Sequence, residues 1–347
     1  MEGAGYEFES RFNGRYSLVA RKMMRMLSEN SRMTNTEIAK KLGVTRQAVA
    51  KRLSRLEKEF GISYTLELHE EALGLVHPHL IMVRFGEKPD YGQVRELLLR
   101  SHIPQFAATM KGGRDMLIYA NSVSRSGYAH WDKGMQQMLA KYKTSWYPSE
   151  IAHKQLGFFQ IRNETLDKVK IDDNYKSIIK FLNQDSRASF REMAKKLGMP
   201  FHTLLYNYKK LLKAGYIRRF TIVEKPVAHT VAMYYFAKLT LTDRFAQCAA
   251  EARKALMYDD QHPLVSRYSF CSQLIGSGDF FVMGVFDNRK TGYRNGVLYY
   301  KHAMESQKVK MTYGIIDKVL VGRLPLRSVD DKKEYHVQEW NPELAPE

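Results

Sequence analysis

Two segments of the chain align with each other without a gap, and this internal repeat limits the fold more than any other feature. The segments are "LSENSRMTNTEIAKKLGVTRQAVAKRLSRLEKEFGI" (27–62) and "LNQDSRASFREMAKKLGMPFHTLLYNYKKLLKAGYI" (182–217), at an offset of 182 − 27 = 155 residues. The identical pairs include Ser31 with Ser186, Arg32 with Arg187, and Glu37 with Glu192. A chain of 347 residues with such a repeat is expected to contain one structural unit twice.

The first copy predicts a helix-turn-helix. Its apolar spacing predicts three helices, at about 15–29, 34–41 and 46–59. Thr34 and Glu37 have the spacing of a capping box, and Gly43 allows a tight turn before Thr45 caps the third helix. Short helices joined by such a turn are typical of this motif.

The third predicted helix has one apolar face and one cationic face. The apolar stripe, which we expect to face the core, consists of Val49, Leu53, Leu56 and Phe60. The opposite face consists of Gln47, Lys51, Ser54 and Lys58, flanked by Arg46, Ala50 and Arg55. In a DNA major groove, Gln can pair with adenine and Arg or Lys with guanine. We therefore predict DNA contact by this helix; the alternative is an ordinary solvated surface.

The remainder of each copy predicts a ferredoxin-like sandwich. After the first copy come a strand "PHLIMVRFG", a helix "YGQVRELLLRSH", a hairpin around Gly112 and Gly113, a helix "AHWDKGMQQMLAKY" and a strand "SEIAHKQLGFF". The second copy repeats this βαββαβ order from "VAMYYFAKLTL" to "KVKMTYGIIDKVLVG". We expect an α+β protein with two tandem copies of a winged helix-turn-helix plus a ferredoxin-like βαββαβ sandwich.

Polar and charged stretches suggest the domain boundaries. The predicted segments are a flexible N-terminus (1–14), a first winged helix-turn-helix (15–66), a first ferredoxin-like domain of the ligand-sensing type (67–161), a linker (162–173), a divergent second winged helix-turn-helix (174–224), a second ferredoxin-like domain (225–325) and a charged tail (326–347).

The run "TEIAKKLGVTRQAVAKRLSRLEKEFGI" is similar to the helix-turn-helix of the Lrp/AsnC transcription regulators, in which a winged helix-turn-helix precedes a βαββαβ ligand-sensing domain. The resemblance covers about residues 15–325 and is most specific in the first helix-turn-helix. With the periodicity, it gives the predicted DNA-binding residues Thr45, Arg46, Gln47, Lys51, Arg52, Ser54 and Arg55. Arg52 lies at the edge of the cationic face, so we expect it to hold a phosphate rather than read a base.

The second copy departs from this pattern. Pro200 stands where Thr45 caps the first copy's helix, which is acceptable in the first turn. The outward residues are now less cationic and more aromatic, which suits a second DNA half-site, a protein contact or stacking on unpaired bases. This second face contains His202, Thr203, Tyr206, Lys209 and Lys210.

The two predicted hairpins share a Gly-rich turn followed by Asp. The resemblance implies an amino-acid effector pocket beside these hairpins, at Gly112, Gly113, Asp115, Gly276, Gly278 and Asp279. Exposed turn amides could bind a carboxylate and Asp an ammonium group. The alternative, which we favour, is simple hairpin chemistry in which Gly supplies the positive φ.

The charge of the chain favours a polyanionic partner. A formal net charge of +18 indicates nucleic acid first and an anionic membrane second. The sequence has no run of about 18 apolar residues and begins "MEGAGYEFES", so we expect a cytoplasmic protein without a membrane partner. Cys248 and Cys271 form no CxxC pair and the histidines lack metal-binding spacing, so we expect neither a metal nor a cofactor.

Two rival functions need to be weighed. The siroheme decarboxylases resemble this chain in their paired Lrp-like units, but the resemblance implies a His-Asn-Tyr signature on the second sandwich strand. Here the comparable strands read "IPQFAATMK" and "LVSRYSFCS", and only Tyr268 matches, so we predict no enzyme activity. The other rival is a nonspecific architectural or RNA-binding protein. Such a protein would bind nucleic acid through its charge alone and would show little sequence preference.

The sequence therefore predicts a sequence-specific DNA-binding transcription regulator of the Lrp/AsnC type. Members of that family form dimers through their sandwich domains, and two copies on one chain would supply this partner internally, as a pseudo-dimer with unequal half-sites. The expected partner is double-stranded DNA, and contacts with the transcription machinery or with a second chain stay open.

Overall fold

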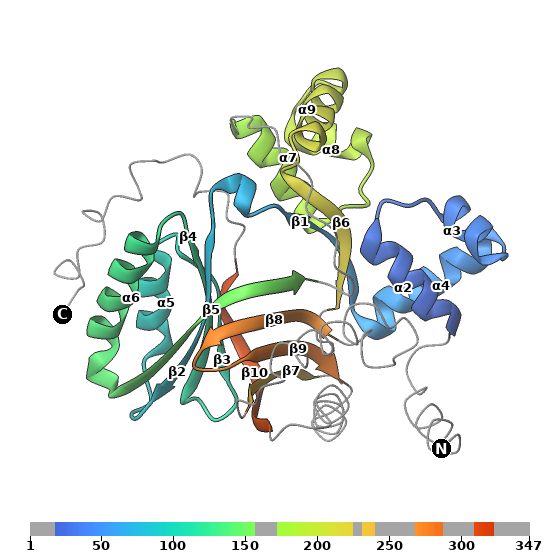
Figure 1. The fold of residues 1–347 in the computed structure, drawn as a ribbon. Coiled ribbons are helices and arrows are strands. Elements are labelled where there is room, and N and C mark those ends of the chain that lie inside the picture. The colour runs from blue at the N-terminus through green and yellow to red at the C-terminus, as the bar shows by residue number, and fades with distance from the viewer. Residues whose placement is uncertain (1–17, 157–171, 225–230, 240–267, 287–308, 323–347) are drawn as a thin grey trace, which may run out of the picture.

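The computed structural model describes residues 18–156, 172–224, 231–239, 268–286 and 309–322. They form two helical heads, a two-stranded sheet between the heads, and a closed β-barrel (Figure 1). Head 1 consists of α2 (Leu18–Glu29), α3 (Asn35–Leu42) and α4 (Arg46–Phe60), and head 2 of α7 (Asp173–Gln184), α8 (Phe190–Leu197) and α9 (Phe201–Lys213). No helix in these ranges is long and apolar enough to cross a membrane.

Local sequence signals determine where the helices of the heads begin and end. The capping box is formed: Thr34 accepts from the Glu37 amide, and the Glu37 carboxylate accepts from the Thr34 amide. Gly43 has φ 64° and Gly198 has φ 61°, a left-handed conformation that glycine adopts without a Cβ penalty. Both turns therefore direct the chain into the following helix in the same way.

The two heads share one wing. Strand β1 (Ile62–Leu68) follows head 1, β6 (Ile217–Glu224) follows head 2, and the two strands pair antiparallel with Thr65 opposite Thr221. Helix α2 packs on β6 and α7 packs on β1. Ile222 thus lies in the core of head 1, and Leu66 and Leu68 lie in the core of head 2. Because each core contains side chains from the other copy, the heads are packed as one unit.

The barrel consists of eight strands in the order β10-β3-β4-β2-β5-β8-β9-β7. The first copy contributes β2 (His77–Phe85), β3 (Pro104–Met110), β4 (Asp115–Ser122) and β5 (Thr144–Leu156). The second copy contributes β7 (Val231–Leu239), β8 (Tyr268–Gly276), β9 (Phe280–Phe286) and β10 (Val309–Gly322). Each set has the strand order of a ferredoxin-like sheet, and the sheets join at both edges, β5 to β8 and β3 to β10.

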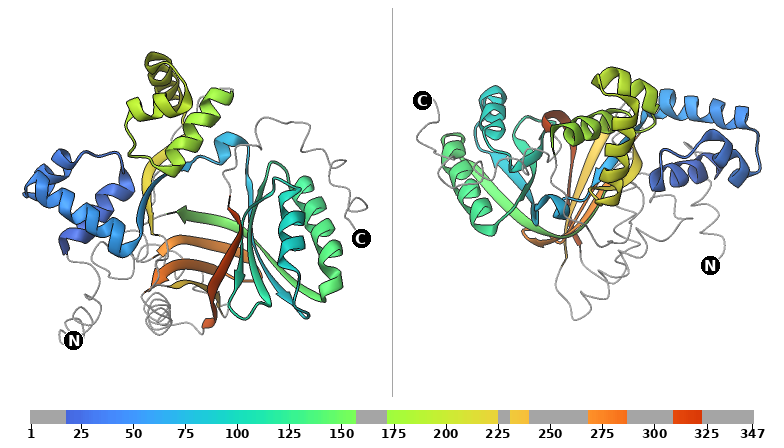
Figure 2. Two further views of the ribbon diagram at one scale, coloured as in Figure 1. Left: turned by 180° about the vertical axis from the view of Figure 1, so that it is seen from behind. Right: turned by 90° about the horizontal axis from the view of Figure 1, so that it is seen from above.

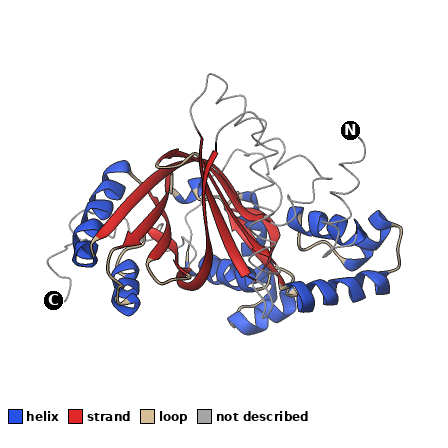
Figure 3. Ribbon diagram, turned by 90° about the horizontal axis from the view of Figure 1, so that it is seen from below, coloured by secondary structure: helices blue, strands red, loops and turns tan. Residues whose placement is uncertain are grey.

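Two apolar cores support the barrel. The inner core brings together side chains of both copies, such as Leu80, Leu117, Tyr234 and Phe281. The outer core lies under α5 (Tyr91–Leu99) and α6 (Arg125–Leu139), which cover the first sheet, and its largest buried side chain is Trp131. Head 1 lies on the side of the barrel opposite these helices, and head 2 lies above the barrel (Figure 2). The strands of the barrel lie between α5 and α6 on one side and head 1 on the other (Figure 3).

The structure confirms the predicted α+β fold, with one difference in how the copies meet. The wing of each head is not a hairpin of its own copy, because β1 and β6 pair with each other. The two helices predicted for the second sandwich, at 244–256 and 292–306, lie outside the described residues, as do the 1–14 and 326–347 segments.

Candidate nucleic-acid interface

Helix α4 presents the cationic face that its sequence predicts. Val49, Leu53 and Leu56 are buried in the core of head 1, whereas the Phe60 side chain lies outside the described residues. Of the predicted DNA-binding residues, five are exposed and two are half-buried; the exposed ones are Thr45, Arg46, Gln47, Lys51 and Arg55, and the half-buried ones are Arg52 and Ser54. Together with the exposed Ala50 and Lys58 they form what we name the α4 face.

The α4 face is held by the ends of its helix and by contacts along it. The Thr45 hydroxyl accepts a hydrogen bond from the Ala48 amide at 3.1 Å, and Gly61 ends the helix at φ 67°. The Arg52 guanidinium donates to the Ala48 carbonyl oxygen at 3.4 Å, so it lies against its own helix. Arg55 pairs with Glu59 at 2.7 Å, an exposed ion pair that adds little stability.

Helix α9 occupies the same place in head 2 but presents other chemistry. All five predicted residues of the second face are exposed, namely His202, Thr203, Tyr206, Lys209 and Lys210. Pro200 precedes the helix without a side-chain cap. The Lys210 ammonium lies 5.7 Å from the centroid of the Tyr206 ring, and its hydrogen bond with Tyr175 raises its pKa.

The contact between the heads follows the repeat. Ser31 and Ser186, which are equivalent residues of the two copies, are fully buried and hydrogen-bonded through their hydroxyl oxygens at 2.5 Å. The Ser31 amide donates to the Phe220 carbonyl oxygen, and the Ser186 amide donates to the Tyr64 carbonyl oxygen. A pseudo-twofold axis therefore passes between the two serines.

Two equivalent arginines close this contact from either side. The Arg32 guanidinium donates to the carbonyl oxygens of Ser186 and Ala188 and lies 4.5 Å from the Phe190 ring centroid. The Arg187 guanidinium donates to the Ser31 carbonyl oxygen at 3.1 Å and to Asn35 at 2.9 Å. We name Ser31, Ser186, Arg32 and Arg187 the seam. The seam limits how far α4 and α9 can move relative to each other.

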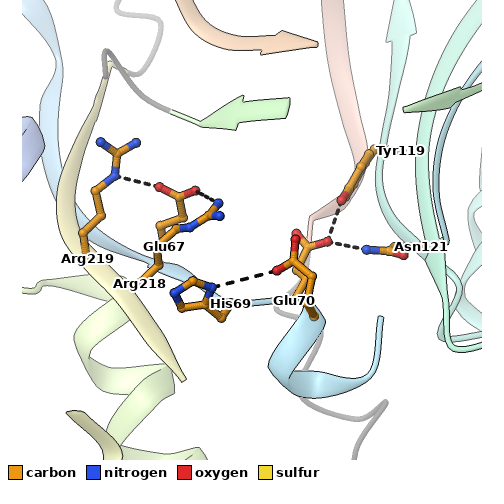
Figure 4. A network of polar contacts seen from close by, with 8 residues as sticks. Glu67, His69, Glu70, Tyr119, Asn121, Arg218 and Arg219 are labelled. Atoms are coloured by element: carbon orange, nitrogen blue, oxygen red, sulfur yellow. Dashed lines mark hydrogen bonds and ion pairs between the residues drawn. The ribbon is translucent and has the colours of Figure 1, made fainter. Parts of the chain in front are cut away.

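A buried ion cluster supports the shared wing. The Glu67 carboxylate accepts from Arg219 at 2.7 Å and from Arg218 at 3.2 Å, across the pair of β1 and β6 (Figure 4). Glu67 and Arg219 are 8% and 6% exposed, so both charges are shielded from water. Removal of one partner from such a group is costly because the other charge stays buried.

A second polar contact links the wing to the barrel. Glu70 lies between β1 and β2, and its carboxylate accepts hydrogen bonds from the Tyr119 hydroxyl at 2.6 Å and from the Asn121 amide, both on β4 (Figure 4). Burial and the neighbouring Glu70 raise the pKa of Tyr119 well above its ordinary value. This contact connects the segment just after β1 with β4, the barrel strand that follows the Gly112–Gly113 turn.

The predicted effector positions form ordinary hairpin contacts. Gly112 and Gly113 have φ 104° and 65°, as a tight turn requires, and Asp115 is paired with Arg84 at 3.0 Å. In the second hairpin, Gly276 has φ 135°, and Asp279 accepts from the Leu274 amide through its carbonyl oxygen. A Cβ at Gly278 would lie 2.3 Å from the Phe236 ring. Backbone geometry and packing therefore account for these residues.

The described residues show no other chemical site that the sequence suggested. No group of three or more His, Cys, Asp or Glu side chains in these ranges could hold a metal ion. Cys248 lies outside the described residues, and so do the side chains of Cys271 and Tyr268. The seam was not predicted, although the alignment places its serines and its arginines at equivalent positions.

Comparison with known proteins supports the assignment of the heads. The family model for winged helix-turn-helix DNA-binding proteins matches residues 19–59 and 171–218, which are the two heads. The HTH-type transcriptional regulator FL11 of Pyrococcus abyssi is 32% identical over 25% of this chain and 58% of its own length. An uncharacterized HTH-type regulator of Pyrococcus furiosus is 41% identical over 16% of this chain and 38% of its own length. The chain thus spans about half the length of these relatives or less.

Two solved structures that resemble the chain do so at low identity. The siroheme decarboxylase NirDL is 12% identical, with 92% of this chain and 97% of that chain covered at a TM-score of 0.47. LrpC of B. subtilis is 18% identical, with 43% of this chain and 96% of that chain covered at a TM-score of 0.31.

These findings define the chain first as a protein with two winged helix-turn-helix heads. Two such heads stand in tandem on one chain, and their likeness to HTH-type transcriptional regulators agrees with the resemblance to the Lrp/AsnC regulators that the sequence predicts.

Proposed function

We propose that the chain is a sequence-specific DNA-binding transcription regulator of the Lrp/AsnC type that acts as an intramolecular pseudo-dimer. The observation that carries the proposal is the α4 face, a cationic and amide-bearing surface on a helix that is capped at its start and anchored in the core of head 1. The net charge of +18 supports a polyanionic partner. The names of the Pyrococcus relatives, which are HTH-type regulators, support the same class.

Different residues of the α4 face would contact the bases and the phosphate backbone. Gln47 and Lys51 are exposed near the start of the helix, where a recognition helix meets base edges. Arg52 lies at the side of the face and contacts its own helix, which suits a phosphate contact. The small exposed Ala50 leaves room for close approach to the groove. Base reading and backbone binding are therefore assigned to different side chains.

The seam gives the pseudo-dimer its geometry. Because the Ser31 and Ser186 contact and both arginines hold the heads together, α4 and α9 would meet DNA at a fixed separation. For heads related by a twofold axis, half-sites lie about 34 Å apart, one turn of the duplex, or a multiple of it. The two half-sites would be unequal, because the two faces carry different residues.

The remaining expectations from the family stay proposals. We propose that the regulator works in the cytoplasm and without bond-making chemistry, by occlusion or recruitment at a promoter. An amino-acid effector at the hairpins stays a prediction, and the pairing of Asp115 with Arg84 favours the structural role of that turn. A spectrum of the protein after incubation with a tetrapyrrole tests the siroheme-decarboxylase alternative.

The test begins with selection of binding sites from a random duplex pool at physiological salt. We expect enrichment of a spaced motif of two unequal parts. On that motif, Gln47→Ala and Lys51→Ala should each cost about 1–3 kcal/mol and relax base preference, while Arg52→Ala should weaken all duplexes alike. Lys88→Ala, an exposed charge change between β2 and α5, is the matched control and should leave binding unchanged. Equal losses on motif and random duplex for Gln47→Ala and Lys51→Ala would refute direct base reading by α4.

A further inference from the structure

The two recognition helices differ most at the positions that would face bases. With the offset of 155 residues, four α4 residues near the helix start correspond to four in α9. The pairs are Arg46 with Phe201, Gln47 with His202, Ala50 with Leu205, and Lys51 with Tyr206. Hydrogen-bonding and small side chains in head 1 are thus replaced in head 2 mainly by apolar and aromatic ones.

The later part of the helix stays cationic. Arg55 and Lys58 of α4 correspond to Lys210 and Lys213 of α9, and Ser54 corresponds to a third lysine, Lys209; all three lysines are exposed. Two more exposed lysines, Lys195 and Lys196, lie on α8 just before the turn. Head 2 therefore keeps lysines that can bind a phosphate backbone, although Arg52 is replaced by the buried Asn207. The arginine and lysine near the start of α4 that can pair with guanine are replaced by Phe201 and Tyr206.

The apolar residues of α9 are available to a partner. Tyr206 is 63% exposed and Phe201 is 39% exposed, whereas Leu204 and Leu211 on the opposite side of the helix are buried in the core of head 2. The Lys210 ammonium lies over the Tyr206 ring, so charge and apolar surface belong to one patch. A basic patch with apolar side chains at its centre fits an anion that carries apolar groups between its charges.

Thymine is the base that meets this description. In the major groove its C5-methyl group is the apolar feature of the base edges, and apolar side chains contact it. We propose that head 2 reads a thymine-containing half-site of duplex DNA through methyl contacts by Phe201, Leu205 and Tyr206, while its lysines bind the flanking phosphates. This inference rests on the proposed function, and it assigns to head 2 a specificity different from that of head 1.

Replacement of thymine by deoxyuridine tests the proposal, because it removes the methyl group and leaves the hydrogen-bonding edge unchanged. The selected duplex is made in three forms: unmodified, with deoxyuridine in the half-site of head 2, and with deoxyuridine in the half-site of head 1. Footprints of the full chain and of Lys51→Ala first show which half-site belongs to which head. We expect the head 2 substitution to weaken binding about fourfold per contacted methyl, from about 0.8 kcal/mol per buried methylene-sized group. The head 1 substitution should change binding less than twofold.

Variants of α9 complete the test. Phe201→Ala and Tyr206→Ala should bind the thymine and deoxyuridine duplexes with nearly equal affinity, because the methyl contact is already lost. Lys210→Ala is the matched control and should weaken both duplexes alike while it preserves their ratio. Circular dichroism of each variant shows whether head 2 stays folded, and Tyr206→Phe keeps the ring where Tyr206→Ala does not fold.

Three results would overturn the proposal. They are an unchanged affinity for the deoxyuridine duplex, a footprint that covers the head 1 half-site alone, and tighter binding of head 2 to single strands than to duplex. The last two would leave the α9 face to a protein or to unpaired bases. In each case the footprint and base preference of head 1 stay intact, whereas failure of the proposed function removes sequence preference altogether.

Discussion

Replacement of Arg32 tests whether the seam holds the heads together. Its guanidinium donates to two carbonyl oxygens of head 2, at 2.5 Å from Ser186 and 3.3 Å from Ala188. It also lies 4.5 Å from the centroid of Phe190, with Tyr208 and Phe220 within 6 Å. Burial lowers the pKa of Arg32, which indicates that its charge is partly removed from water.

The expected cost follows from these contacts. A hydrogen bond from a charged group contributes about 1.5 kcal/mol at the low end, and a half-buried cation–π contact about 0.5–1 kcal/mol. With two such hydrogen bonds and the contact with Phe190, Arg32→Ala should lower the free energy of unfolding of the heads by about 3.5–4 kcal/mol. Arg32→Lys keeps the charge but not the planar fork, so we expect about half that loss.

Urea unfolding with two probes gives the assay. Trp131 and Trp146 lie in the first sandwich, so their fluorescence in a Trp340→Phe background follows the barrel, while circular dichroism also follows the helices of the heads. The helical transition should move to lower urea and the tryptophan transition should stay in place. Arg25→Ala, which removes an exposed pair with Glu29, is the control and should cost less than about 1 kcal/mol. If Arg32→Ala costs no more than this control, the seam does not hold the heads.

Two further predictions concern the barrel and the pH dependence of stability. Gly278→Ala places a Cβ 2.3 Å from the Phe236 ring, so we expect the free energy of unfolding, measured by thermal unfolding, to fall by about 1–3 kcal/mol. The control Gly43→Asn keeps a left-handed turn and should cost almost nothing. Equal stability of Gly278→Ala and the wild type would contradict the packing. Burial raises the pKa of Tyr91 and of Tyr234 to about 12 each, so these hydroxyls ionise more readily in the unfolded chain. The free energy of unfolding should therefore be constant below about pH 10 and fall from there towards pH 12. A urea midpoint that does not fall across this range would exclude the effect.

The sequence was most informative where the signal is local. The capping box at Thr34, the turn at Gly43 and the apolar stripe at Val49, Leu53 and Leu56 each depend on residues a few positions apart. Such patterns predict helices and their buried faces directly. The ferredoxin-like sandwich also followed from the βαββαβ order of the predicted elements. The α4 face could therefore be predicted before the structure.

The contacts between the copies could not be predicted in the same way. Glu67 and Arg219 are 152 residues apart in the sequence. No pattern within either segment indicates that β1 pairs with β6. The alignment shows that Ser31 and Ser186 are equivalent residues of the two copies. Equivalence alone does not predict that they contact each other at the pseudo-twofold axis. The start of β5 at Thr144, earlier than its apolar pattern suggests, follows from the left-handed Lys143 at φ 54°. Choice of partner strand is a property of the whole chain.

The presence of both heads on one chain has an evolutionary consequence. In a homodimeric regulator one codon specifies the same residue in both DNA-contacting helices. Each mutation therefore alters the recognition of both halves of the operator together. Here α4 and α9 are encoded separately, while the shared wing and the closed barrel keep them in one frame. Under the proposed function, each half of the DNA site can therefore change in sequence together with its own helix, without loss of recognition of the other half.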